Sequence, residues 1–212
     1  VEGYGLSECS PVLIANPVGP SRRAGTVGLP LPATEARVVD PESPLNDVET
    51  GAEGELVVRG PQVFSGYWNK PEETAKVFVA DPAGGAPWFR TGDIVSIDPD
   101  GFVRIVDRIK ELIITGGFNV APTEVEDVLR RHPSIADAAV VGLPDAVQGE
   151  AVVAAVVLAD GALLDEEALR AFARETLTPY KVPKRFIVID ELPRSLIGKV
   201  LRKQVKEKLT AG

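Results

Sequence analysis

A lysine stands at the end of a polar loop, directly after a glycine, in residues 193–199. Lys199 carries a compact positive charge on a flexible stem, which suits it to meet a phosphate or a carboxylate. Gly198 lets the backbone turn without the steric penalty of a Cβ atom. A basic stretch with helical spacing follows at 200–209, so the same pattern also fits a surface turn before a solvated helix. The rest of the chain must decide between the two interpretations.

A second group of candidates opens the chain, where residues 3–8 read Gly-Tyr-Gly-Leu-Ser-Glu. Ser7 and Glu8 offer oxygen ligands of the kind that Mg²⁺ takes from a protein, usually one or two groups beside substrate phosphates. Tyr4 offers an aromatic surface between flexible glycines. Taken alone, this segment also fits an ordinary turn.

Further along, a carboxylate and a guanidinium have the right chemistry for a sugar. Asp93 ends the sequence Thr-Gly-Asp and can accept hydrogen bonds, while Arg108 in the charged segment 107–110 can donate them. By position alone, Asp93 also fits a turn residue before an apolar strand, and 107–110 fits a charged loop. Gly116 and Gly117 give a backbone that another molecule can approach closely.

Five blocks in this order resemble the second half of the adenylate-forming, or AMP-binding, enzymes. That family includes acyl-CoA synthetases, peptide-synthetase adenylation domains and beetle luciferases. The likeness spans nearly all of the 212 residues, and five blocks in the right order are far more specific than one. The blocks are residues 3–8, 54–60, 89–93, 106–120 and 193–199.

The resemblance implies a nucleotide site for ATP and AMP. Its implied members are Tyr4 and Gly5 beside the adenine, Ser7 near the phosphates, Glu8 on Mg²⁺, Asp93 and Arg108 on the ribose, and Asn119 facing the nucleotide. No Ser/Thr/Gly-rich phosphate loop occurs in the chain, and in the family that loop lies upstream of the first block. The resemblance therefore leads us to expect a missing N-terminal portion of the large domain, and no ligase activity from this chain alone.

The resemblance also implies a reaction in two steps. Lys199 would be the catalytic residue that stabilises charge as a carboxylic acid joins the α-phosphate of ATP, and Gly116 and Gly117 would line the channel for CoA. Asp107 and Lys110 would belong to the hinge between the steps, because hinges are a few positions at the ends of elements. An apolar residue at Ile114, where luciferases carry lysine, favours a fatty acid as the substrate.

Two other functions fit the same resemblance. One is a peptide-synthetase adenylation domain that loads a carrier protein, although no carrier domain follows Gly212. The other is a fragment that binds nucleotide or CoA without catalysis.

His132 is the single histidine, so a histidine triad within this chain is excluded, and Cys9 is expected to be a buried, inert thiol.

The elements that must position these residues read as an α+β fold. In the first half, strands are expected at 36–39 and 56–58, and a hairpin at 94–105 whose turn is Asp-Pro-Asp-Gly. The many Pro and Gly residues between 17 and 87 favour a β-rich, loop-connected region. By resemblance, residues 1–107 are the C-terminal portion of the large AMP-binding domain.

The second half predicts a small α+β domain over 108–212. Pro122 should begin a helix that ends at His132, and Asp165 should cap another that runs to Leu177. The nearly continuous apolar runs 135–143 and 151–158 predict strands buried on both faces, and 186–189 predicts a third strand.

Composition sets the remaining limits. With 44% hydrophobic residues the chain can bury a core, and no apolar run is long enough to cross a bilayer. One cysteine and no leader at the first residue favour a cytoplasmic location. Residues 181–212 are basic, but the tail lacks interleaved aromatic residues and the whole chain is acidic at net −8, so we expect small-molecule partners and no nucleic acid.

Overall fold

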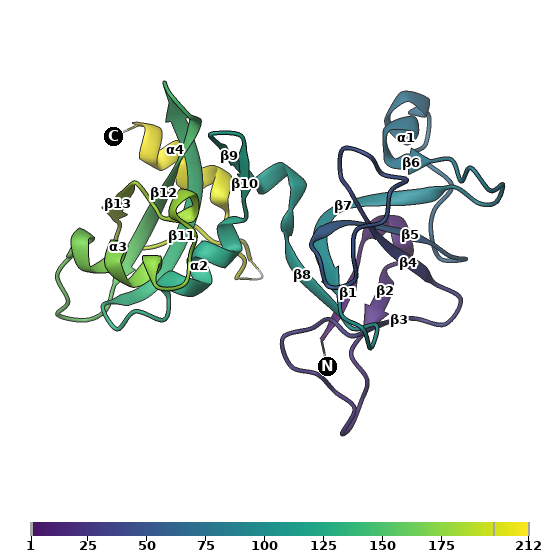
Figure 1. Cartoon of the computed structure of the whole chain (residues 1–212), viewed down its shortest axis with the longest axis horizontal. Coiled ribbons are helices and arrows are strands. Elements are labelled where there is room, and N and C mark those ends of the chain that lie inside the picture. Colours follow the sequence, from purple (N-terminus) through teal and green to yellow (C-terminus); the bar gives the residue numbers. More distant parts are fainter. Residues whose placement is uncertain (1, 197, 212) are drawn as a thin grey trace. The chain divides into compact units, whose positions relative to one another are not determined.

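The structure, a computed structural model, describes residues 2–196 and 198–211. It divides into two compact units, Val1–Ile109 and Lys110–Gly212, which are described separately below (Figure 1). Helices and sheets both contribute, so the predicted α+β class is confirmed. No helix among the described residues is both long and apolar enough to span a membrane.

The first unit is built from two antiparallel sheets. The smaller sheet has the order β1 (Gly3–Gly5), β2 (Val12–Ala15), β3 (Leu29–Pro30). The larger has the order β4 (Glu35–Val39), β5 (Gly54–Arg59), β7 (Trp88–Ile97), β6 (Phe78–Val79), and β8 (Val103–Arg108) also pairs with β7. A short 3₁₀ turn, η1 (Ser7–Cys9), and one helix, α1 (Pro71–Val77), complete the unit.

The strands of this unit bury one shared core. Leu13 and Ile14 of β2 pack with Leu56 and Val58 of β5 and with Val95 of β7, and each of these five side chains is fully buried. The expected hairpin is confirmed, because β7 and β8 pair across the turn at 98–102. β5 is buried along five consecutive residues, Gly54 to Val58, which fits the short apolar run that predicted a strand there.

One expectation for this unit was wrong. Thr91-Gly92-Asp93 was placed before the strand, but β7 begins at Trp88 and the three residues lie inside it. The apolar pair before Arg90 extends the pairing with β5 and β6, and this pairing was not evident from the sequence. Gly92 has φ +73°, which suits glycine and lets the strand depart from regular pleating at this point.

The second unit contains a five-stranded sheet in the order β10 (Phe118–Val120), β9 (Ile113–Thr115), β12 (Gly149–Leu158), β11 (Ile135–Asp145), with β13 (Arg185–Val188) parallel to β12. Its helices are α2 (Pro122–Leu129), α3 (Glu166–Arg174) and α4 (Arg202–Ala211). Two 3₁₀ turns also occur: η3 (Pro179–Lys181), and η2 (Ile109–Glu111) at the boundary with the first unit.

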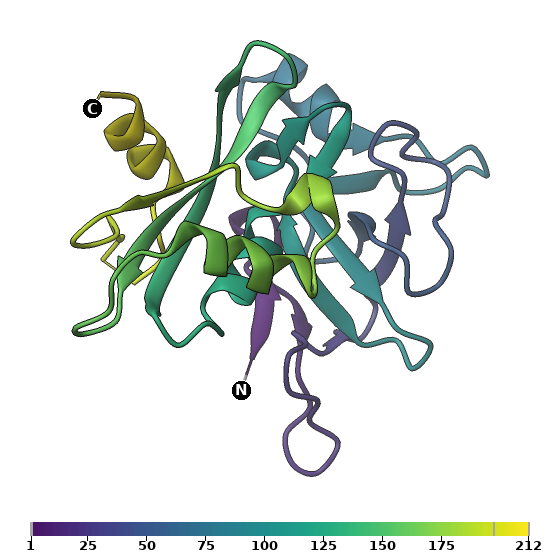
Figure 2. The same ribbon diagram turned by 60° about the vertical axis from the view of Figure 1, so that its left-hand side comes forward.

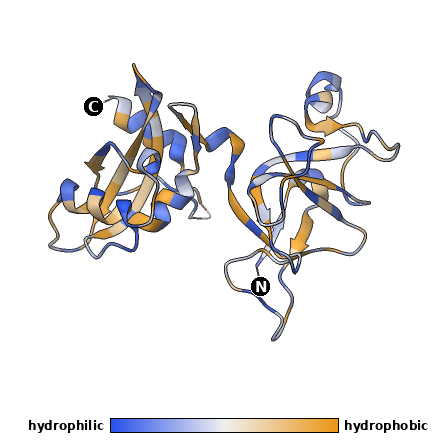
Figure 3. Cartoon of the chain, viewed as in Figure 1, coloured by the Kyte–Doolittle hydropathy of each residue, from blue (hydrophilic) through white to orange (hydrophobic). Residues whose placement is uncertain are grey.

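Strands β11 and β12 are buried on both faces, as the sequence predicted. On one face Val140 and Val152 pack with Val125 of α2 and Leu169 of α3. On the other face their neighbours along the strands, such as Val141, pack beneath α4. Figure 2 shows α3 and α4 on opposite sides of the sheet, and Figure 3 shows the apolar colouring of its central strands.

The helices are shorter than predicted. Asp165 caps α3 as expected, by accepting a hydrogen bond from the amide of Ala168 at 2.9 Å, but α3 ends at Arg174 and not Leu177. Likewise α2 begins at Pro122 and ends at Leu129 before His132. The final turns are only partly helical, which apolar spacing does not reveal.

Gly5 has a packing role that the sequence did not show. A Cβ atom built on it would lie 1.8 Å from the carbonyl oxygen of Pro11, whereas one on Gly3 would meet only the oxygen of Ile14 at 3.4 Å. We expect Gly5→Ala to destabilise this unit by about 1–3 kcal/mol, because backbone must move apart. Gly3→Ala is the matched control in the same strand, and urea unfolding should separate the two. Equal stabilities would contradict the close approach.

Candidate functional site

Three of the predicted nucleotide residues meet in the first unit. Asp93 is almost completely buried, and its two carboxylate oxygens have different partners. The hydroxyl of Tyr4 donates to Oδ2 at 2.5 Å, and Nε of Arg108 lies 2.9 Å from Oδ1. The cross-strand register places Asp93 directly opposite Arg108 on β7 and β8, which explains how residues fifteen apart in sequence meet.

The electrostatics of this cluster favour a neutral phenol at Tyr4. Burial raises the pKa of Tyr4, and the negative charge of Asp93 and its hydrogen bond raise it further. Tyr4 therefore stays protonated and serves as a donor. Its partner Arg108 remains largely exposed, so that it can reach a ligand while it neutralises Asp93.

A buried ion pair supports the strand that carries Asp93. Glu55 on β5 is 1% exposed and binds the guanidinium of Arg90, with Oε2 at 2.5 and 2.9 Å from its nitrogens. The other oxygen of Glu55 accepts the amide of Gly92 at 3.2 Å. Thr91 adds a hydrogen bond from its hydroxyl to the carbonyl of Leu56 at 2.8 Å. Hydrogen bonds to β5 thus fix the irregular backbone at Thr91 and Gly92, just before Asp93.

The predicted metal residues sit on η1, and they gain an unexpected partner. Ser7 is exposed and Glu8 is half-buried. The hydroxyl of Tyr67 donates to Oε1 of Glu8 at 2.9 Å, and the ring of Tyr67 packs edge-on against Phe64. Burial and the charge of Glu8 raise the pKa of Tyr67. The only sequence signal for Tyr67 is its place in Gly-Tyr-Trp, shortly before α1.

Cys9 adjoins Glu8 but points into the core. It is fully buried, and burial together with the charge of Glu8 raises the pKa of its thiol to about 11. Because the thiolate is the reactive form, we expect the folded chain to react with iodoacetamide at pH 8 far more slowly than the chain in guanidinium chloride. Comparable rates of labelling in the two states would contradict a buried, neutral thiol.

In the second unit, Gly116 and Gly117 form the tip of a hairpin between β9 and β10. Their φ angles are +57° and +82°, as in the two-residue turns that match the twist of paired strands. The amide of Gly116 donates to the carbonyl of Gln148 at 2.9 Å, while among the described residues no atom beyond the chain neighbours of Gly117 lies within 4 Å of a Cβ built on it. The hairpin tip is therefore anchored at Gly116 and open to solvent at Gly117. Asn119, the predicted nucleotide contact, is exposed on β10.

Lys199 lies on an exposed loop, as predicted. We call residues 194–200 the Lys199 loop; Ile197 within it lies outside the described residues. The loop closes on itself, because the amide of Ser195 donates to the carbonyl of Lys199 at 2.8 Å and the amide of Lys199 donates to the Ser195 hydroxyl at 3.2 Å. Gly198 has φ +80°, so the predicted need for glycine before the lysine holds. The ammonium of Lys199 has no ion-pair partner among the described residues.

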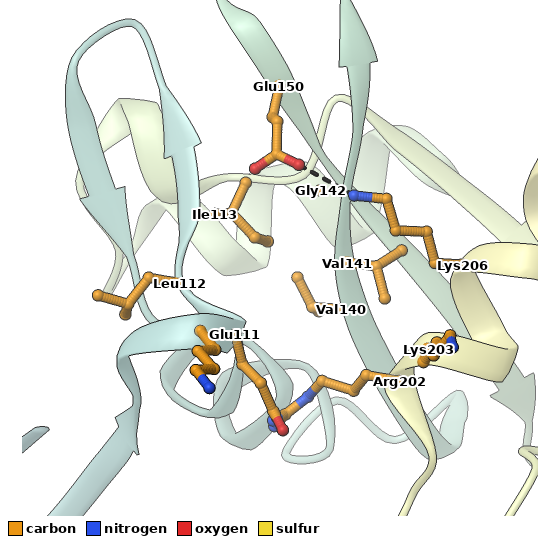
Figure 4. Close-up of a pocket in the computed structure, with 11 residues that line it drawn as sticks. Glu111, Leu112, Ile113, Val140, Val141, Gly142, Glu150, Arg202, Lys203 and Lys206 are labelled. Carbon is orange, nitrogen blue, oxygen red and sulfur yellow. Dashed lines mark hydrogen bonds and ion pairs between the residues drawn. The ribbon is translucent and has the colours of Figure 1, made fainter. Parts of the chain in front are cut away.

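The residues predicted as the hinge lie at the division between the units. Asp107 is buried on β8, and its Oδ1 accepts the amide of Arg108 at 2.9 Å. Lys110 lines a groove of about 270 Å³ in the second unit, together with Glu111, Glu150 and the first turn of α4 (Figure 4). Lys199, Gly116 and Gly117 do not line this groove.

The structure thus brings the candidates into separate groups. Tyr4, Asp93 and Arg108 contact one another, whereas Gly5 packs against backbone and Ser7 and Glu8 lie on the next turn. In the second unit the glycine hairpin and the Lys199 loop are separate features. Glu55 and Tyr67 were missed because their importance depends on which strand or turn lies beside them. Among the described residues no group of three or more metal-ligating side chains forms.

Comparisons with known proteins relate both units to the AMP-binding enzymes. The model for the AMP-binding enzyme family matches residues 1–68, and the model for the AMP-binding enzyme C-terminal domain matches residues 124–199. The chain is 46% identical over 207 residues to a long-chain-fatty-acid–CoA ligase of Escherichia coli O157:H7, covering 98% of this chain and 35% of that protein. It is also 46% identical over 211 residues to the enzyme of the same name from Bacillus subtilis strain 168, with coverages of 99% and 36%.

A solved structure agrees with these sequence relatives. The crystal structure of ATP-bound MatB from Rhodopseudomonas palustris superposes with a TM-score of 0.87 at 40% identity, covering 98% of this chain and 40% of that one. The chain spans about a third of the length of the ligases it matches. The order of the sequence blocks, the Tyr4–Asp93–Arg108 cluster and these matches lead to one conclusion: the chain belongs to the family of AMP-binding enzymes.

Proposed function

We propose that this chain is the C-terminal portion of an ATP-dependent, AMP-forming acid:CoA ligase whose substrate is a fatty acid. The observation that carries the proposal is the buried carboxylate of Asp93 between Tyr4 and Arg108, in a chain 46% identical to long-chain-fatty-acid–CoA ligases. A buried carboxylate with donors on both sides is suited to hold a polyhydroxy ligand in one orientation.

The cluster has the capacity to bind a ribose. An ionised carboxylate has about four lone-pair sites, and Tyr4 and Arg108 occupy one on each oxygen of Asp93. One site per oxygen is left for the two hydroxyls of a ribose. Arg108, being exposed, can donate to the same sugar from the other side. In this proposal the ring of Tyr4 lies along the adenine, with Gly5 beside it, and Asn119 approaches the nucleotide from the second unit.

The residues of η1 fit a magnesium ion that is shared with the phosphates. Oε1 of Glu8 accepts from Tyr67, and Oε2 has no hydrogen-bond partner among the described residues, so it is available to a cation. One carboxylate with a neighbouring hydroxyl, Ser7, is a typical protein contribution to a Mg²⁺–nucleotide site. When bound, the ion would neutralise charge on the phosphates and so help pyrophosphate to leave.

Lys199 is proposed to act in the first half-reaction. A carboxylate oxygen of the acid attacks the α-phosphorus of ATP, and the bond to the bridging oxygen of pyrophosphate breaks, which yields an acyl-adenylate and pyrophosphate. Negative charge gathers between the two reactants as they approach. An exposed ammonium with no carboxylate partner among the described residues is free to meet that charge.

The glycine hairpin is proposed to act in the second half-reaction. The thiolate of CoA attacks the acyl carbon, and AMP leaves with the electron pair of the broken C–O bond. The open edge at Gly117 lets a thin pantetheine chain pass close to the backbone. Residues 107–110, which join the two compact units, are proposed as the hinge that exchanges Lys199 for this hairpin between the steps.

The proposal is tested on the full-length protein that contains this chain. Incubation with palmitate, ATP, Mg²⁺ and CoA should give palmitoyl-CoA, AMP and pyrophosphate in equal amounts. A peptide-synthetase role would instead appear as acyl transfer to a phosphopantetheinylated carrier protein with none to free CoA. If AMP binds the protein but no acid yields pyrophosphate, the ligase proposal is wrong and a non-catalytic nucleotide-binding role replaces it.

A further inference from the structure

Among the described residues, few contacts fix the Lys199 loop on its own domain: Val200 packs against the core beneath α4, and ion pairs hold the two ends of the loop. Its internal hydrogen bonds close a turn, but they do not join that turn to the sheet or the helices. Leu196 at its tip is fully exposed, and Lys199 is exposed as well. The direction in which Lys199 points therefore depends on how the two ends of the loop are held.

The N-terminal end is held by an ion pair to β11. The guanidinium of Arg194 binds Oδ2 of Asp137 and also donates to the carbonyl of Gly198 inside the loop. Arg130, just after α2, binds the other oxygen of Asp137 at 3.0 Å. Burial would raise the pKa of Asp137, but these two arginines outweigh it and hold the pKa below its usual value. Asp137 is thus charged at neutral pH and is shared between the loop and α2.

The C-terminal end is held by Arg202, the first residue of α4 and three positions after Lys199. Its guanidinium makes two hydrogen bonds to the carboxylate of Glu126 on α2, at 2.9 and 2.8 Å, and a third to the hydroxyl of Thr123 at 2.7 Å. It also pairs with Glu111, beside the groove shown in Figure 4. This fork-to-fork pairing sets orientation as well as distance.

Both ends of the loop lead to the same buried carboxylate. Glu126 is 3% exposed, and in addition to Arg202 it accepts the amide of Val140 at 2.9 Å and approaches Arg130 at 3.5 Å. One connection runs directly from Glu126 to Arg202. The other runs from Glu126 through Arg130 and Asp137 to Arg194.

We propose that Glu126 is a positioning residue for Lys199, acting through Arg202 at one end of the Lys199 loop and through Arg130, Asp137 and Arg194 at the other. A buried ion pair is weak evidence for stability, because apolar side chains of similar volume often serve as well. It does impose one geometry. A displacement of about 1 Å in a reacting group can cost about 10²-fold in rate, so the network would matter most to the step that uses Lys199.

The first experiment measures mobility in the 212-residue chain itself. The ¹⁵N order parameters of Gly198 and Lys199 are compared in the wild type, Glu126→Gln, Arg194→Gln and Lys203→Met. Lys203 is the matched control, since it follows Arg202 in α4, is exposed, and has no ion-pair partner among the described residues. We expect both network variants to lower the order parameters toward the values below about 0.6 that mark flexible backbone, and Lys203→Met to leave them unchanged.

The second experiment rests on the proposed function and uses the full-length ligase. Glu126→Gln should lower the kcat of ATP–pyrophosphate exchange by about 10- to 100-fold, with the KM for ATP changed less than about threefold. Conversion of supplied acyl-adenylate and CoA to thioester should stay within about twofold of the wild type. Arg194→Gln should shift the same step in the same direction, and because Arg194 is exposed this variant tests the idea even if Glu126→Gln unfolds.

The outcomes separate the two proposals. A wild-type protein that releases no pyrophosphate with any acid refutes the ligase function, and the order parameters then decide the positioning role alone. A wild-type protein that is active, with variants that slow both half-reactions equally or neither, refutes the positioning role and leaves the ligase function standing. Unchanged order parameters in Glu126→Gln and Arg194→Gln also refute it.

Discussion

Under the proposed ligase function, Lys199→Ala in the full-length protein is expected to slow ATP–pyrophosphate exchange by about 10²- to 10³-fold, the loss typical of removing one donor that stabilises transition-state charge. The substitution should not disturb the fold, because Lys199 is exposed and its side chain has no ion-pair partner among the described residues. Its structural contributions are backbone bonds to Ser195, and alanine retains both of them.

The same variant should convert supplied acyl-adenylate and CoA to thioester at nearly the wild-type rate. In the proposed mechanism Lys199 has by then been exchanged for the glycine hairpin, so its ammonium does not meet the charge that develops on the departing AMP. Stopped-flow measurement of AMP release isolates this step. Lys203→Met removes an exposed positive charge four residues after Lys199, in the first turn of α4, and should leave both half-reactions unchanged.

Gly116→Asn is expected to have the opposite effect to Lys199→Ala, slowing thioester formation and leaving adenylation unchanged. A bulky residue at Gly117 would mix obstruction with strain, since φ is +82° there. Asparagine followed by glycine suits a two-residue hairpin turn with positive φ, and only Gln148 lies near a Cβ on Gly116, at 4.0 Å. The variant should fold normally and slow thioester formation by about 10- to 100-fold, as expected for 1–3 kcal/mol of steric conflict with pantetheine. If it slowed adenylation to the same extent as Lys199→Ala, the division of the two steps between the loop and the hairpin would be wrong.

The elements of the second unit followed from the sequence because their signals are strong and local. Apolar runs at 135–143 and 151–158 can only be buried on both faces, and Pro122 and Asp165 mark the starts of helices by their own chemistry. The hairpin tip at Gly116 was read for its chemistry but not as a hairpin. Its two strands are three residues each, which is too short for alternation to be seen.

The buried carboxylates that support the candidate residues could not be predicted from the sequence, for a different reason. Glu55 and Glu126 stand in sequence as charged residues, and charged residues are mostly exposed. Their burial depends on arginines 35 and 76 positions away, which only the folded topology brings beside them. The family resemblance linked Asp93 and Arg108 to one ligand, which local pattern cannot do; the structure shows the two side chains in contact, and their role at a ribose stays a prediction.

Glu55→Gln is expected to destabilise the first unit by about 3–5 kcal/mol, the usual cost of removing one partner from a buried ion pair. Glu55 is 1% exposed, and its loss leaves the guanidinium of Arg90 without a carboxylate in a site where that side chain is 27% exposed. The partial exposure of Arg90 favours the lower end of the range.

Glu35→Gln provides the matched control. Glu35 also joins an arginine on the neighbouring strand, with two hydrogen bonds to Arg59, but its side chain is 59% exposed, so water can replace the lost charge. Urea unfolding followed by the fluorescence of Trp88, which lies on β7 beside Arg90, should show a large shift for Glu55→Gln and little for Glu35→Gln. Equal shifts would show that burial does not govern the strength of these pairs.

The same variant also tests how the proposed ribose site is held. Oε1 of Glu55 accepts the amide of Gly92, next to Asp93, while Oε2 accepts from Arg90. Glutamine has one acceptor oxygen, so it cannot satisfy both donors, and Glu55→Gln should weaken AMP binding under conditions where the unit is still folded. Glu55→Leu combined with Arg90→Leu separates the two effects, because an apolar pair of similar volume can recover stability without restoring that hydrogen bond. We expect the double variant to regain much of its unfolding free energy and to bind AMP as poorly as Glu55→Gln in calorimetry. Recovery of AMP binding together with stability would show that Glu55 contributes to the fold alone, and that Asp93 is oriented by Tyr4 and Arg108 without help from β5.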